Sequence, residues 1–179
     1  MKVAVFCSSR MGNRTEYAEE TRKLGLALAK AGCELVYGGE EYGLMKVVAD
    51  SVLAGGGRAC GVIPNIPMMQ EHIHPHLQEY VYVRDMAERK SMMMKLADAF
   101  IALPGGTGTL DELSEVLCQN KIGEMDKPLL LLNVAGYYDP LWQFLEQMVT
   151  EGMMDETDPA QLMMASTASE AVAALIQKQ

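Results

Sequence analysis

Short apolar runs alternate with longer segments of helical periodicity along this chain. An apolar run of strand length predicts a buried strand, and apolar residues three and four positions apart predict an amphipathic helix. The runs predict strands at residues 2–7, 34–39, 58–64, 79–83, 99–104, 128–133 and 161–166. The periodic segments predict helices at residues 15–32, 43–56, 85–98, 109–120, 138–152 and 168–178.

The alternation of strands and helices predicts the fold class. Such chains form a parallel sheet covered by helices on both faces, so we expect an α/β fold with a doubly wound parallel sheet. A length of 179 residues is enough for one domain with a substantial core. Residues 1–179 contain no linker, internal repeat or low-complexity segment, which favours a single domain.

Three of the predicted strands end in polar or glycine-rich residues. Ser8, Ser9 and Arg10 follow the first strand, Gly38 and Gly39 end the second, and a glycine-rich loop follows the fifth. Ligands bind beyond the carboxyl ends of the strands in open α/β sheets. We therefore expect these three ends to meet at one rim and to form the binding site.

The charge balance restricts the class of ligand. The formal net charge of −9 argues against nucleic acid and anionic membranes as partners. A small anionic ligand is compatible with this charge, because a local cradle of backbone N–H groups attracts an anion despite the field of the whole protein.

The apolar segments and the cysteines predict a cytoplasmic location. The apolar run at the N-terminus is too short for a signal peptide, and no segment is long enough to span a membrane. Cys7, Cys33, Cys60 and Cys118 are widely spaced and form no CxxC pair. They are interpreted as free thiols, mostly buried, in a reducing compartment.

The glycine-rich loop after the fifth strand predicts a phosphate site. A strand, then G-G-T-G-T, then a helix presents backbone N–H groups and a helix dipole to an anion. The nucleotide-binding G-x-x-x-x-G-K-[ST] and G-x-G-x-x-G patterns are both absent. The candidate phosphate ligands are Gly105, Gly106, Thr107, Gly108 and Thr109.

Glu112 admits two interpretations. Thr109 and Glu112 form a T-x-x-E pattern, which is typical of a helix capping box. If the Thr109 hydroxyl binds phosphate instead, Glu112 is free to face the sugar of a nucleotide one helical turn further on. The residues alone leave capping and chemistry open.

Arg89 and Lys90, in the predicted helix before the fifth strand, also admit two interpretations. They are either a solvated pair whose stems cover Met86 and Met93, or a group that supports an anionic ligand and orients a carboxylate. The adjacent Met92, Met93 and Met94 are interpreted as core or interface residues.

His72, His74 and His76 have the H-x-H-x-H spacing of residues that share one face of a strand. A metal site is the weaker interpretation, because Pro75 interrupts that strand and no cysteine or aspartate adjoins it. We therefore predict no metal.

Five segments together resemble the Lonely Guy (LOG) family along almost the whole chain. They are "VFCSSRMG", "LVYGGEEYGLMKVVAD", "GVIP", "MAERKSMMMKLADAFIALPGGTGTLDEL" and "KPLLLLNVAGYYDPL". The family signature is P-G-G-x-G-T-x-x-E preceded by an R-K pair. The resemblance implies a Rossmann-like homodimer that needs no cofactor and hydrolyses the N-glycosidic bond of AMP or cytokinin riboside 5′-monophosphates.

The resemblance also assigns roles by position. Arg89 and Glu112 match the catalytic pair, Lys90 adjoins the same site, and residues 105–109 match the 5′-phosphate loop. Glu71 falls at a substrate-contacting glutamate, and Ser9 and Gly39 lie at strand ends of the site. The family usually has C-G-S-S, Y-G-G-G and G-L-M-G where this chain has C-S-S-R, Y-G-G-E and G-L-M-K, which adds bulk and charge around the first two strand ends.

Two other functional classes compete with the hydrolase. A non-catalytic carrier of a phosphorylated, nucleotide-like cofactor would use the same phosphate cradle but would leave the Arg89 and Glu112 pair unexplained. A pyridoxal-phosphate decarboxylase would need a lysine for a Schiff base, and neither Lys90 nor Lys95 lies in a recognisable cofactor motif.

Overall fold

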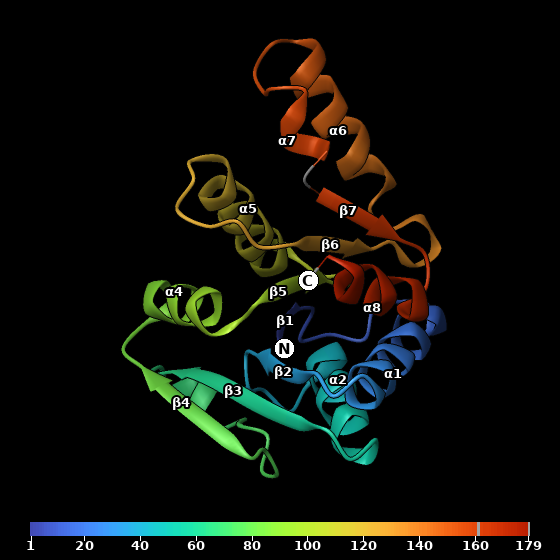
Figure 1. Ribbon diagram of the computed structural model, residues 1–179. Helices are drawn as coiled ribbons and strands as arrows, with labels where there is room; N and C mark the ends of the chain where they lie inside the picture. Colours follow the sequence, from blue (N-terminus) through green and yellow to red (C-terminus); the bar gives the residue numbers. More distant parts are fainter. Residues whose placement is uncertain (161, 179) are drawn as a thin grey trace.

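A computed structural model describes residues 1–160 and 162–178 and contains one seven-stranded parallel sheet between two layers of helices (Figure 1). The strands are β1 Lys2–Phe6, β2 Glu34–Tyr37, β3 Arg58–Pro64, β4 Glu79–Val83, β5 Ala99–Ala102, β6 Leu129–Leu132 and β7 Leu162–Ala165. The helices are α1 Thr15–Lys30, α2 Gly43–Ala54, α3 Pro67–Gln70, α4 Met86–Leu96, α5 Thr107–Lys121, the 3₁₀ helix η1 Val134–Gly136, α6 Asp139–Thr150, α7 Thr157–Ala160 and α8 Ala168–Gln177.

The predicted strands and helices are all present, with ends that differ by a few residues. The predicted start of the last strand at Gln161 lies outside the described residues. The short helices α3, η1 and α7 are additional. None of the helices in residues 1–160 and 162–178 combines the length and the hydropathy that crossing a membrane requires.

The order of the strands in the sheet reverses direction between β1 and β5. The order is β4-β3-β2-β1-β5-β6-β7, and all neighbouring strands run parallel. The chain therefore winds one way from β1 to β4 and the other way from β5 to β7, as in Rossmann-like folds. Phe6 pairs with Ala102, so the loops that follow β1 and β5 leave the sheet side by side.

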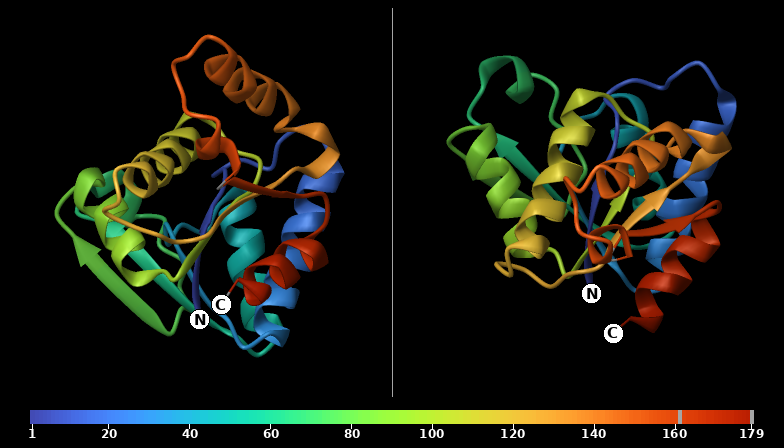
Figure 2. Two further views of the ribbon diagram at one scale, coloured as in Figure 1. Left: turned by 45° about the horizontal axis from the view of Figure 1, so that its top comes forward. Right: turned by 90° about the horizontal axis from the view of Figure 1, so that it is seen from above.

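Alternate residues of the central strands supply two separate cores. Val3 and Val5 face α1, α2 and α8, whereas Ala4 and Phe6 face α4, α5 and α6. Helix α8 packs beside α1, as both views of Figure 2 show. Burial of each large aliphatic side chain contributes roughly 1.5–3 kcal/mol, so the double layer holds the strand ends rigidly.

Three of the four free cysteines belong to these cores. Cys7, Cys33 and Cys60 are buried, as their apolar sequence context predicts, and Cys118 is exposed.

The two helices that contain a T-x-x-E pattern begin in different ways. Thr167 caps α8: its hydroxyl accepts a hydrogen bond from the backbone of Glu170, whose carboxylate accepts one from the backbone of Thr167. Helix α5 instead begins after Gly106, which offers no side-chain cap. Thr109 is therefore the third residue of α5, and the interpretation of Thr109 and Glu112 as a capping box is wrong.

Candidate active site

A cavity of about 460 Å³ opens at the carboxyl ends of β1, β2 and β5. Its walls come from residues 7–10 after β1, from Glu40 after β2, from residues 106–109 at the start of α5, and from Arg89 and Glu112. Met45, Met69 and Met86 add apolar surface. The predicted convergence of three strand ends at one rim is confirmed, and the cavity is large enough for a small-molecule ligand.

The start of α5 provides a row of backbone donors along this cavity. Gly106 is the N-cap and makes no side-chain cap bond, and the first turn contains no acidic residue. The first N–H groups of the helix and the positive end of its dipole are thus available to an anion. A Cβ atom at Gly105 would lie 2.1 Å from Oγ1 of Thr109, so only glycine allows this tight turn.

Hydrogen bonds from two tyrosines hold the strand end and loop that lead to α5. The Tyr137 hydroxyl donates to the carbonyl of Gly105, and the Tyr138 hydroxyl donates to the carbonyl of Leu103 at 2.6 Å. Both tyrosines follow η1, so the connection after β6 supports the cradle.

The start of α2 is used differently from the start of α5. The backbone N–H groups of Leu44 and Met45 both donate to the Ser8 carbonyl, at 3.0 and 3.3 Å. Gly43 has a φ of +53°, and a Cβ atom there would lie 2.2 Å from the carbonyl carbon of Ser9. The first donors of α2 therefore fix the loop after β1, and the exposed Ser9 and Arg10 of that loop line the cavity.

Arg89 projects from α4 into the base of the cavity and is only 5% exposed. Its Nη2 atom lies 3.7 Å from Oε1 of Glu112, and its Nη1 atom lies 3.9 Å from Oε1 of Glu40. Its Nε–H group is buried and has no hydrogen-bond partner among the residues that the structure describes. A Cβ atom at Gly38 would lie 2.0 Å from Nη2, so this glycine makes room for the guanidinium. The interpretation of Arg89 as part of a solvated pair is wrong.

Glu112 is the second charged group of the site. Burial raises the pKa of the Glu112 carboxyl to about 7, against the opposing attraction of Arg89. Both protonation states of Glu112 are therefore accessible near neutral pH, which suits a proton acceptor. Burial also raises the pKa of the neighbouring Cys7 thiol well above its ordinary range, so this lining residue stays protonated.

Glu40 is a third charged group, one that the sequence patterns did not identify as a site residue. It is the first side chain after the two glycines that follow β2, and 15% of the side chain is exposed. Burial raises the pKa of its carboxyl above the ordinary value, and Arg89 and His72 oppose the shift. The sequence feature that could have identified Glu40 as a site residue is its place at the carboxyl end of a predicted strand.

Four of the predicted site residues do not line the cavity. Gly105 lies in the turn before α5 and borders a smaller neighbouring cavity instead. Lys90 instead bonds Asp111, which itself lines the cavity, at 2.9 Å and Glu115 at 3.2 Å. Gly39 is buried in the backbone beneath Glu40 and has a φ of +80°. Glu71 is exposed at the end of α3, two residues beyond Met69 of the cavity wall.

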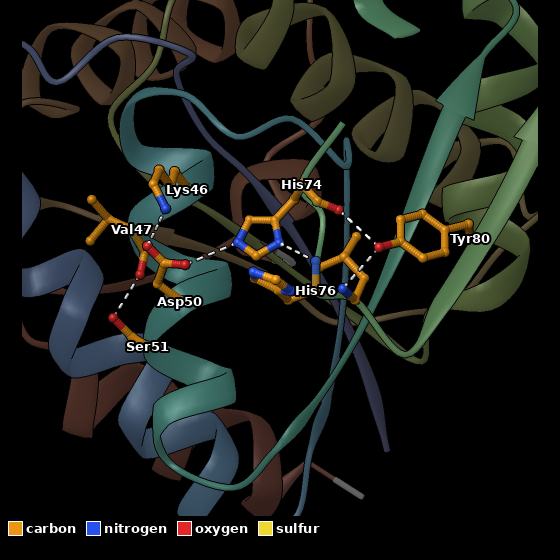
Figure 3. Close-up of polar contacts among 8 residues, drawn as sticks. Lys46, Val47, Asp50, Ser51, His74, His76 and Tyr80 are labelled. Atoms are coloured by element: carbon orange, nitrogen blue, oxygen red, sulfur yellow. Dashed lines mark hydrogen bonds and ion pairs between the residues drawn. The ribbon is translucent and has the colours of Figure 1, made fainter. Parts of the chain in front are cut away.

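The three histidines do not converge on one point. His74 is buried, and its Nε2 atom lies 2.9 Å from Asp50 of α2, while its Nδ1 atom accepts from the N–H of His76 (Figure 3). His72 instead bonds the Tyr42 hydroxyl at 2.8 Å. Within residues 1–160 and 162–178, no three His, Cys, Asp or Glu side chains are placed to hold a metal ion. The structural partner of His74, Asp50, comes from a distant part of the sequence.

Residues 45–175 match a family model described as "Possible lysine decarboxylase". Curated relatives of the chain are described differently. The cytokinin riboside 5′-monophosphate phosphoribohydrolase LOG1 of Arabidopsis thaliana is 42% identical over 96% of this chain and 80% of its own length. The chain belongs to the LOG family. A probable enzyme of the same name, LOGL1 of Oryza sativa, is 43% identical over 94% of this chain and 76% of its own length.

Solved structures share the fold of this LOG family member at lower identity. The molybdenum cofactor binding protein of Rippkaea orientalis superposes with a TM-score of 0.77 at 19% identity, covering 99% of this chain and 96% of that one. The description of the family model as a lysine decarboxylase finds no support in the cavity, because no lysine is among the residues that line it in the described part of the chain. A Schiff base with pyridoxal phosphate requires such a lysine.

Proposed function

We propose that the protein is a nucleoside 5′-monophosphate phosphoribohydrolase, which splits AMP or a cytokinin riboside 5′-monophosphate into free base and ribose 5-phosphate. One observation carries the proposal. The backbone cradle at residues 106–109 and the pair of Arg89 and Glu112 line the same cavity. The activity by which the curated LOG relatives are named agrees with this arrangement.

The cradle fixes the phosphate end of the nucleotide. Gly106, Thr107, Gly108 and Thr109 donate to the phosphate oxygens, and Gly105 allows the turn that aims them. Binding energy from this remote group holds the ribose against Glu112, which is one helical turn further along α5. Ser9 and Arg10 close the phosphate side from the loop after β1.

Glu112 acts at the anomeric carbon of the ribose. Cleavage of the glycosidic bond builds positive charge on the ring, and a carboxylate beside it stabilises that charge. Glu112 accepts a proton from the attacking water as the water oxygen bonds to C1′. The electron pair of the broken bond goes to the base nitrogen, which takes up a proton from water.

Arg89 orients Glu112 and supplies the compensating positive charge. Its guanidinium lies within 4 Å of the carboxylate without forming a direct hydrogen bond, so a small movement on ligand binding completes the contact. Lys90 and Gly39 support the site from outside the cavity. Contact of Glu71 with the part of the nucleotide that projects from the cavity stays a prediction.

Product analysis of the purified protein tests the proposal. Incubation with AMP and with a cytokinin riboside 5′-monophosphate is expected to release free base and ribose 5-phosphate. Tight binding of these nucleotides without release of base would overturn the hydrolase and favour the alternative, a carrier of a phosphorylated cofactor.

We further propose that the protein is a single-domain homodimer that works in the cytoplasm. Exposed Met86 on α4 adjoins the cavity and supports an interface there, and the buried free thiols suit a reducing compartment. The apolar surface of α4 is smaller than its sequence suggests, because Met93 and Met94 belong to the core. Light scattering that gives the mass of a monomer would contradict the dimer.

A further inference from the structure

We propose that Glu40 is a positioning residue of this site, which shares the Arg89 guanidinium with Glu112 and thereby moves the ionisation of Glu112 to higher pH. This inference rests on the proposed hydrolase function for its kinetic consequence. It does not follow from the roles assigned above, in which the cradle, Arg89 and Glu112 suffice.

The geometry divides one cation between two carboxylates. Nη1 of Arg89 faces Oε1 of Glu40 at 3.9 Å, and Nη2 faces Oε1 of Glu112 at 3.7 Å. The three side chains are between 6% and 15% exposed, so solvent screens their interaction weakly. The single positive charge of Arg89 can balance only one of the two carboxylates, so each raises the cost of ionising the other.

The backbone of Glu40 is fixed, which keeps its carboxylate at this position. Residues 39–41 pair with residues 72–74, a contact that we call the latch: the Glu41 N–H donates to the His72 carbonyl at 2.9 Å, and the His74 N–H donates to the Gly39 carbonyl at 2.8 Å. Glu40 itself pairs with Ile73 in an antiparallel bridge.

The latch is secured in turn by His74. Its ring bonds Asp50 of α2, and its carbonyl accepts from the Tyr80 hydroxyl at 2.9 Å (Figure 3). The backbone that carries Glu40 is thus attached both to α2 and to β4. A backbone held in this way preserves the separation between Glu40 and Arg89 in the empty protein.

The other charges around Glu112 are accounted for by the same structure. In decreasing order of effect, Arg89 favours the ionised form of Glu112, its neighbour Asp111 opposes it, Lys90 of α4 favours it and Glu40 opposes it. Lys90 bonds Asp111 and Glu115, so the opposite effects of Lys90 and Asp111 on Glu112 largely offset one another. The thiol of Cys7 and the phenol of Tyr138 face Glu112 as neutral groups. Glu40 is the other carboxylate within 4 Å of the Arg89 guanidinium among the described residues, so its removal would leave that cation to Glu112.

The pH dependence of kcat/KM for AMP tests the role of Glu40. The acid limb of this profile reports ionisation in the free enzyme. In Glu40→Gln, loss of the second negative charge is expected to move the acid limb to lower pH by about 0.5–1 unit. Glu41→Gln removes the same charge one residue away, outside the cavity, and is expected to leave the limb in place. An unchanged limb in Glu40→Gln, or equal movement in both variants, would overturn the inference.

A titration of the empty protein separates this inference from the proposed function. Carbon-13 labelling of glutamate carboxyl groups, with Glu112→Gln used to assign the Glu112 resonance, measures the ionisation of Glu112 without any turnover. Glu40→Gln is expected to shift that titration to lower pH whether or not AMP is cleaved. A titration that coincides with that of the unmodified protein would overturn the role of Glu40, whereas absence of base release by the unmodified protein would overturn only the hydrolase.

Discussion

The chain contains the same local pattern, T-x-x-E, at the start of two helices that behave differently. In Thr167-x-x-Glu170 the two side chains bond each other's backbone and close the end of α8. In Thr109-x-x-Glu112 the helix has already begun, and both side chains line a cavity. The residues of the pattern are identical in type, so the difference arises from what precedes them.

The glycines before Thr109 account for the difference. Gly105 and Gly106 adopt a turn that starts α5 at Thr107, which moves Glu112 to the sixth position of the helix. At that position its carboxylate faces Arg89 instead of the backbone of its own first turn. A helix start that caps itself is a stabilising element, whereas one that leaves its donors free is available to a ligand.

The largest expected effect is on kcat and distinguishes Glu112 from Glu170. Glu112→Gln is expected to lower kcat for AMP by roughly 10²–10⁴-fold, because it removes the proton acceptor and the negative charge beside the ribose. Glu170→Gln, the matched change in the other pattern, is expected to leave kcat unchanged. Steady-state release of adenine measures both, and equal rates for the two variants would remove the functional distinction.

The same two variants are expected to differ in stability, and for Glu112→Gln the size of the effect depends on pH. The pKa of Glu112 is raised from 4.5 to about 7 in the folded protein, so the folded state binds the extra proton and loses stability as pH rises through this window. Above pH 7 the loss amounts to roughly 3 kcal/mol. Glu112→Gln is therefore expected to be more stable than the unmodified protein at pH 8 and equally stable below pH 4.5.

Urea denaturation at several pH values checks this difference. Glu170→Gln is expected to lose a little stability throughout, because it removes half of a capping box. A Glu112→Gln variant that is less stable at pH 8 would mean that the buried carboxylate is stabilising in its ionised form.

Gly38→Ala tests whether Glu112 depends on the buried arginine. The added methyl group would lie 2.0 Å from Nη2 of Arg89, so the guanidinium must move. We expect kcat to fall by about 10–100-fold while the protein remains folded, since misplacement of a catalytic group by about 1 Å costs on this order. Gly56→Ala controls for destabilisation away from the site: Gly56 has free space but a φ of +75°, so this variant is expected to lose stability and to keep its kcat. A similar loss in both variants would contradict the packing argument.

The smallest expected effect concerns the two threonines. Thr167→Ala is expected to lower the free energy of unfolding by about 1 kcal/mol through loss of the cap. Thr109→Ser keeps a hydroxyl at the cradle and is expected to change that free energy less. Thermal unfolding of both variants measures the two losses of stability. A larger loss in Thr109→Ser than in Thr167→Ala would show that Thr109 has a structural role.

The sequence pattern predicted the sheet and the rim because both depend on local hydrophobicity. Short apolar runs such as residues 129–132 form buried strands of the parallel sheet. The carboxyl ends of parallel strands then meet at one edge of that sheet. Resemblance to the LOG family, and not the periodicity, brought Arg89 and Glu112 together. Their contact joins α4 to α5 across β5, and no local rule encodes it.

The missed features all depend on tertiary contacts. The T-x-x-E pattern at Thr109 matched a cap, but the turn at Gly105 had already started the helix. Glu40 was visible only as a change in bulk and charge, because its partner Arg89 lies in another helix. His74 was weighed as a metal ligand, yet it meets Asp50 of α2 and has both ring nitrogens bonded. Arg89 is the contrasting case, because its buried Nε–H has no partner within the described part of the chain.

The two tyrosines behind the cradle also bear on the order of events during turnover. Because Tyr137 and Tyr138 hold the loop backbone before any ligand arrives, little conformational freedom is lost when a phosphate binds. The cradle binds the 5′-phosphate, which the nucleotide and ribose 5-phosphate have in common. Its contacts with the ligand are therefore the same before and after the glycosidic bond breaks. In the proposed reaction the base makes no contact with the cradle, so it is expected to depart before the sugar phosphate.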